Sequence, residues 1–277
     1  MFARLHVVAG LFLLLAASIA SGGPMIASGD AILRHDIQRL ADLGVIRGTV
    51  TTWPLAWGPI AADIRAYEEA HALPQDALDA IGRVLARASW EMRTDEVTFN
   101  ARAALAEKPT RIRSFASTPR EKAEISLGVN YTTNIFSVSL NGQAVDSPPD
   151  GKEYRADGSF LGVALGNYSI SANTLERWWG PGWDGSLILS NNARPMPAIS
   201  IDRTFTDPFQ TKWLSWLGPW DLAVHFGQME SDREVPNAQF FGFRFNFRPH
   251  PSLEIGLTRT AQWCGDGRPC DLETFFN

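Results

Sequence analysis

The sequence predicts a mainly β fold, in which an antiparallel sheet follows a small N-terminal α-helical region. Apolar residues recur with a helical period up to about residue 92 and then, after Glu124, alternate with polar residues at every second position. The composition agrees, because 23 glycines, 17 prolines and 10 tryptophans in 277 residues favour turns and aromatic-rich strands over a helical protein.

The first twenty residues predict a secretory signal peptide. Arg4 supplies a positive charge, residues 7–17 are apolar, and Ser18 and Ala20 place small side chains before a cleavage point. This apolar run is shorter than the ~20 residues that a membrane-spanning helix needs. We therefore expect residues 1–20 to be removed on export, and we expect no helical membrane anchor.

Three helices are expected within residues 21–107, the region assigned to a small helical domain. Ser28 or Asp30 can cap the first helix, which ends at Gly44. The second helix begins near Pro59, and the third covers about 75–92.

Residues 94–120 are ambiguous in sequence and are taken as the transition to the sheet. Val97 and Phe99 alternate as in a strand, whereas residues 101–107 have a helical pattern.

Residues 108–277 predict the β portion, with about eight strands. The clearest strand has phenylalanine at 241, 243, 245 and 247 on one face, and Gly242, Arg244, Asn246 and Arg248 on the other. The eight alternating stretches are 125–131, 161–165, 168–172, 187–189, 199–201, 222–227, 241–247 and 253–257.

Alternation alone leaves two architectures open. A soluble sandwich buries its apolar face between two sheets, whereas a transmembrane β-barrel turns that face toward lipid and keeps polar side chains in its lumen. The export signal favours the barrel, as do several strands near the ~9–11 residues that cross a membrane. Tryptophans and tyrosines near strand ends also favour it.

A tryptophan-rich segment, residues 176–203, is the candidate binding site. Clustered aromatic rings can stack on the apolar faces of sugars, while amide and guanidinium groups bond hydroxyls and carboxylates. An aromatic anchor at a membrane interface and an ordinary packed turn are the alternatives. The candidate polysaccharide-binding residues are Trp178, Trp179, Trp183, Asn191, Asn192, Arg194 and Arg203.

The remaining chemistry in the sequence is sparse. Cys264 and Cys270 flank a turn-like stretch, so in an exported chain they predict a small-loop disulfide rather than a metal site. A net charge of -5 gives no basis for nucleic-acid binding. Scattered carboxylates, and the pair His225 and Ser231, leave an exported glycan or lipid hydrolase as an alternative without defined geometry.

The segment Arg-Trp-Trp-Gly-Pro-Gly-Trp-Asp-Gly-Ser-Leu-Ile-Leu-Ser-Asn-Asn-Ala-Arg-Pro-Met-Pro at 177–197 resembles the signature of the Wzi capsule-assembly family of bacterial outer-membrane proteins. The N-terminal stretches at 29–34, 40–42 and 52–55 and the region 259–269 are also similar to that family. The resemblance implies an outer-membrane β-barrel with a periplasmic N-terminal helical region. It further implies a lectin-like, non-catalytic protein that holds capsular polysaccharide or exopolysaccharide at the cell surface.

Two departures from the family qualify these expectations. Family members are longer and have more strands, so we expect this chain to be truncated at its C-terminus and its barrel to be incomplete. With the family as a guide we expect no cofactor, no metal, outer-membrane lipid as surroundings, and a monomer. A passive channel or structural barrel remains an alternative function.

Overall fold

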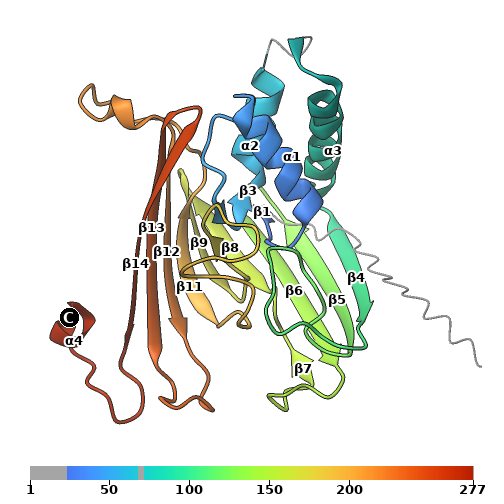
Figure 1. Cartoon of the computed structure of the whole chain (residues 1–277), viewed down its shortest axis with the longest axis vertical. Coiled ribbons are helices and arrows are strands. Elements are labelled where there is room, and N and C mark those ends of the chain that lie inside the picture. Colours follow the sequence, from blue (N-terminus) through green and yellow to red (C-terminus); the bar gives the residue numbers. More distant parts are fainter. Residues whose placement is uncertain (1–23, 68–71, 277) are drawn as a thin grey trace, which may run out of the picture.

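The computed structural model describes residues 24–67 and 72–276. A cluster of helices lies at one end of a long curved antiparallel sheet (Figure 1). The predicted signal peptide lies outside the described residues.

The three predicted helices are present as α1 (Ala31–Asp42), α2 (Trp57–Ala66) and α3 (Gln75–Glu91). The Asp30 side chain caps α1 by accepting a hydrogen bond from the Leu33 backbone nitrogen at 2.9 Å. The apolar stripes of the helices meet in one core, together with the short strands β1 (Met25–Ile26), β2 (Thr52–Trp53) and β3 (Leu55–Ala56). Among the described residues, no helix is long and apolar enough to cross a membrane.

The main sheet has the strand order β14-β13-β12-β11-β9-β8-β6-β5-β4, and β7 pairs with β6 at its margin. All of these pairs are antiparallel. The sheet does not close, so β4 and β14 form its two edges. Its strands are β4 (Val97–Leu105), β5 (Ala123–Thr132), β6 (Phe136–Val145), β7 (Tyr154–Arg155), β8 (Phe160–Leu165), β9 (Tyr168–Asn173), β11 (Ala198–Arg203), β12 (Trp220–Gln228), β13 (Gln239–His250) and β14 (Leu253–Trp263).

Several stretches differ from the sequence-based expectation. Residues 187–189 form no strand, because β9 and β11 pair directly and leave this segment in the loop between them. Strand β4 lies within the segment 21–107, so the sheet begins before the expected boundary at residue 108. Strand β6 is absent from the eight expected stretches, and its Asn141-Gly142 dipeptide, a pair that usually marks a turn, lies here in mid-strand.

The apolar face of the sheet is the exposed one. The polar residues on the opposite face are buried, whereas the exposed apolar face includes Phe99, Leu127, Leu161, Ile199 and Leu257. The buried polar set includes Asn130, Ser139, Ser171, Asn173, Ser200, His225, Arg244 and Asn246. This polarity is the one predicted for a barrel and is opposite to that of a soluble sandwich.

The connections at the two ends of the sheet differ in length. At the end that carries the helices, the connections are 133–135, 166–167, 204–219 and 251–252. At the other end they are 106–122, 146–159, 174–197 and 229–238. Three of the four connections at the helical end are therefore tight turns, while the opposite end carries only longer loops.

Polar residues on β13 and β14 hold the helical region against the inner face of the sheet. The Glu254 carboxylate accepts hydrogen bonds from the backbone nitrogens of Val50 (3.1 Å) and Thr51 (3.2 Å) and from the Thr51 hydroxyl (2.5 Å). Arg248 donates to the carbonyl oxygens of Ala41, Ile46 and Gly48 at 2.7–3.2 Å. Because Ala41 lies in the last turn of α1, this cation also offsets the negative end of the helix dipole.

The sulfur atoms of Cys264 and Cys270 are joined in a disulfide that closes the loop after β14. This loop leads into the short helix α4 (Leu272–Phe276), whose Phe275 packs edge-on against Trp263.

We predict that Glu254→Ala loosens the helical region from the sheet. The substitution leaves the buried amides of Val50 and Thr51 without an acceptor, and each such loss costs about 1–3 kcal/mol. Hydrogen exchange of residues 46–53 should therefore accelerate. Glu234→Ala, at an exposed loop position, is the matched control and should leave the exchange unchanged. Equal protection in both variants would show that Glu254 does not hold this segment.

Candidate functional site

The tryptophan-rich segment forms an internal seam between the sheet and the helical region. Strand β10 (Trp178–Trp179) pairs antiparallel with Thr52–Trp53 of β2. Trp178 is 0% and Trp179 is 2% exposed. The Trp178 indole nitrogen donates to the Gly182 carbonyl oxygen at 2.9 Å. Both rings are therefore enclosed by protein and have no free face for a ligand in this structure.

Trp183 is 39% exposed, and it covers a buried arginine from α1. The Arg34 guanidinium lies 4.3 Å from the Phe115 ring centroid and 4.4 Å from that of Trp183. It also donates to the Pro181 carbonyl oxygen at 2.9 Å. Burial lowers the pKa of Arg34 to about 10, so it stays charged at neutral pH.

The two candidate asparagines hold loops together. Asn191 is fully buried, donates to the Phe115 carbonyl oxygen at 2.9 Å, and accepts from the Ser28 hydroxyl at 3.0 Å. The Asn192 side-chain oxygen accepts from the Arg113 backbone nitrogen at 2.7 Å. These bonds join the segment to the loop 106–122 and to the start of α1.

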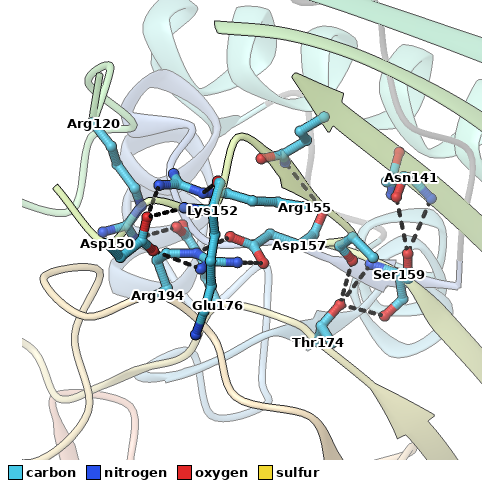
Figure 2. Close-up of polar contacts among 12 residues, drawn as sticks. Arg120, Asn141, Asp150, Lys152, Arg155, Asp157, Ser159, Thr174, Glu176 and Arg194 are labelled. Carbon is cyan, nitrogen blue, oxygen red and sulfur yellow. Dashed lines mark hydrogen bonds and ion pairs between the residues drawn. The ribbon is translucent and has the colours of Figure 1, made fainter. Parts of the chain in front are cut away.

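Arg194 belongs to a network of ion pairs at the long-loop end, as Figure 2 shows. Its guanidinium makes two hydrogen bonds of 2.9 Å to the Asp157 carboxylate and one of 2.8 Å to Asp150. Burial alone would raise the pKa of Asp150, but hydrogen bonds from the Lys152 backbone, Arg194 and Arg155 outweigh it and lower the pKa to about 2. The pair of loops 146–159 and 174–197 is thus joined by groups that stay charged well into acid.

Arg203 lies apart from the other candidates, at the helical end of the sheet. Its guanidinium is 3.7 Å from the Trp220 ring centroid and donates to the carbonyl oxygens of Trp220 and Asp207. The sequence-predicted set is therefore divided between the internal seam, the long-loop network and the opposite end of the sheet.

The alternative pair of His225 and Ser231 also takes separate places. Ser231 is exposed in the loop 229–238, whereas His225 is buried on the inner face of β12. The neighbour of His225 is Ser200, whose hydroxyl is 3.3 Å from the imidazole Nδ1 and accepts a 2.6 Å hydrogen bond from Arg177.

A cavity of about 540 Å³ lies between the inner face of β4–β6 and the helical region. This volume is in the range of small-molecule sites. Its floor includes Asn100, Arg102, Ser126, Asn141 and Gln143 from three adjacent strands. Residues 24–33, together with Arg87 and Glu91, line its helical side, and the walls include Arg113, Arg120, Asp157 and Glu176 from the long loops.

Gly128 makes room for amide side chains on the cavity floor. It lies opposite Asn100 on one side and Asn141 on the other. A Cβ atom there would come within 2.1 Å of the Asn141 oxygen and 2.5 Å of the Asn100 nitrogen. Only glycine therefore lets both amides lie over the central strand.

Sequence reasoning missed this floor, because β6 was not predicted and β4 was assigned to a transition. Inward polar side chains at every second position of 97–105 and 136–145 were the available signal. The arrangement offers many hydrogen-bond donors and acceptors at fixed positions, which suits a polyhydroxylated ligand. Within the described residues, no group of three histidine, cysteine or acidic side chains could hold a metal ion.

Known proteins resemble this chain over nearly its whole length. A curated protein of Klebsiella pneumoniae, described as an uncharacterized 55.8 kDa protein in the cps region, is 31% identical over 99% of this chain and 53% of its own length. A solved structure, described as Wzi, an outer membrane protein involved in group 1 capsule assembly in Escherichia coli and a carbohydrate-binding β-barrel, matches with a TM-score of 0.78. It is 30% identical, and the match covers 92% of this chain and 57% of that one.

The chain thus spans about half the length of the relatives that it matches. The family model described as capsule assembly protein Wzi matches residues 94–277, which include the main sheet, both inward-folded long loops and the disulfide loop. On this match and the shared fold, the chain belongs to the Wzi capsule assembly family.

Proposed function

We propose that this chain is a non-catalytic, carbohydrate-binding part of an outer-membrane protein that holds capsular polysaccharide or exopolysaccharide at the cell surface. The observation that carries the proposal is the polar cavity on the inner side of a sheet whose outer face is apolar. The family supports it, since the Escherichia coli relative is described as binding carbohydrate.

The outer face suits a lipid environment. It is apolar along the strands, and Trp213 and Trp216 are exposed in the connection 204–219 at the helical end. Exposed tryptophans in a connection at one end of the sheet resemble the aromatic girdle of membrane barrels. Outer-membrane barrels also have short periplasmic turns and longer extracellular loops. The helical region would then lie on the periplasmic side and the long loops at the cell surface, with outer-membrane lipid around a monomer.

The cavity reaches the long loops, since Arg113, Arg120, Asp157 and Glu176 belong to its lining. A glycan at the cell surface would thus meet fixed amides, hydroxyls and guanidinium groups there. The helical region covers the other side of the cavity, which favours holding a ligand over conducting one through the lumen.

The proposed orientation predicts which cysteine variants react on intact cells. Glu153→Cys in a long loop should react with a membrane-impermeant maleimide, whereas Ser252→Cys in a tight turn should react only after the outer membrane is permeabilised. The native cysteines, being disulfide-bonded, should not contribute. Labelling of Ser252→Cys on intact cells, with none of Glu153→Cys, would reverse the orientation.

Filling the cavity should block carbohydrate binding. Ser126→Phe places a ring over the floor, and we expect affinity for the polysaccharide of the producing cells to fall about ten-fold or more, measured by calorimetry on the purified chain in detergent. Leu127→Phe makes a similar addition on the outer face of the same strand and is the matched control. Equal binding by both variants would exclude the cavity as the site, and no binding by the unsubstituted chain would refute the proposed function.

A further inference from the structure

We propose that Arg102 makes the cavity a subsite for the carboxylate of an acidic sugar, so that the preferred ligand is a polysaccharide that contains uronic acid. This inference rests on the proposed function and names the ligand class of the same cavity. It comes from one asymmetry of the cavity lining, namely that the Arg102 side chain has no partner among the described residues while the other lining arginines are engaged.

The other arginines of the lining have acidic or carbonyl partners. The distance from a guanidinium nitrogen to a carboxylate oxygen is 2.6 Å for Arg87 and Glu91, 2.6 Å for Arg120 and Glu176, and 2.9 Å for Arg155 and Glu121. Arg113 donates to the Asn191 carbonyl oxygen at 3.0 Å. Arg102 lines the same cavity, but its side chain makes no hydrogen bond and no ion pair with any residue that the structure describes.

The neighbours of Arg102 on the floor are also unengaged. Asn100 lies two residues earlier on the same face of β4, and its side-chain nitrogen is buried without a hydrogen-bond partner. Ser126 is the cross-strand partner of Arg102 on β5, and its hydroxyl makes no hydrogen bond within the described part of the chain. The Arg102 guanidinium and the Ser126 hydroxyl thus line one cavity with free donors, and the unpartnered Asn100 amide nitrogen lies buried beside them.

The acidic groups of the lining do not compete for Arg102. Glu176 pairs with Arg120, and Asp157 pairs with Arg194. Glu124 accepts hydrogen bonds from the backbone nitrogens of Arg120 and Glu121, and Asp30 caps α1. Each carboxylate already has donors, so Arg102 remains the lining cation with unused hydrogen-bonding capacity.

This donor set matches an acidic sugar better than a neutral one. A guanidinium presents two parallel N–H groups that fit both oxygens of a carboxylate. The adjacent Ser126 hydroxyl can bond a ring hydroxyl of the same sugar. A neutral glycan would leave the Arg102 charge without a counter-charge in a half-enclosed site, where such pairs are worth more than in bulk water.

The test compares one glycan in two forms on the full chain folded in detergent. The probes are an oligogalacturonate and the same oligosaccharide with its carboxyl groups reduced to alcohols. We expect the acidic form to bind about ten-fold more tightly at low salt, and we expect this preference to shrink as salt is raised. Arg102→Gln should abolish the preference and leave the affinity for the reduced form within about two-fold.

Two further variants keep the result interpretable. Arg65→Gln removes the same charge from an exposed position of α2 outside the cavity and should keep the full preference. Arg102→Lys retains the charge without the planar fork and should give an intermediate preference. Thermal unfolding of each variant establishes that it is folded.

The outcomes separate the two proposals. If the unsubstituted chain binds both forms equally, or if folded Arg102→Gln still prefers the acidic form, the carboxylate subsite is wrong while carbohydrate binding stands. If the unsubstituted chain binds neither this pair nor the polysaccharide of the producing cells, the proposed function fails and the subsite fails with it.

Discussion

The structure depends on one constraint, namely that a sheet with its apolar face outward must satisfy the polar groups on its inner face. A buried donor or acceptor without a hydrogen-bond partner lowers the stability of the fold, and a buried charge without a partner lowers it further. In this chain the partners come from the helical region and from long loops that fold inward. The contacts of Arg248 with the end of α1, and of Glu254 with Val50 and Thr51, are the clearest examples.

This constraint explains the role of the tryptophan-rich segment. Where the loop 174–197 turns inward, it meets the helical region, and Trp178 and Trp179 pair with β2 in an enclosed apolar seam. The nearby polar residues, Asn191 and Asn192, satisfy backbone groups of the loop 106–122. A segment that has the composition of a sugar site is therefore used, in large part, to join two layers of the protein.

The same inward loops create the cavity and give it its chemical character. The charged residues of its walls each make a hydrogen bond or an ion pair with another protein group; they are Arg113, Arg120, Asp157 and Glu176. The network positions the walls, whereas the side chains of Arg102 on β4 and Ser126 on β5 make no hydrogen bond within the described part of the chain. A wall held by ion pairs and hydrogen bonds, with unengaged groups on the floor, is the arrangement that a pre-organised binding site requires.

The sequence by itself determined those features that depend on neighbouring residues. The helical periods, the Asp30 cap and the alternation of Phe241 to Phe247 with Gly242 to Arg248 are local patterns, and the structure places a helix or a strand at each. Together with the predicted export signal, these patterns favour a barrel over a sandwich. The family could also be recognised from the segment 177–197.

Only the tertiary structure decided the site. Strand β6 depends on its neighbours β5 and β8, which overcome the turn tendency of Asn141-Gly142, and residues 187–189 lack such neighbours. Trp178 is buried because β2, which is distant in sequence, pairs with it. Arg102 keeps a free side chain because the described segments around the cavity place no partner beside it. Such non-local contacts have no period or spacing in the chain, so alternation can indicate the floor strands but not the cavity that the loops and the helical region enclose over them.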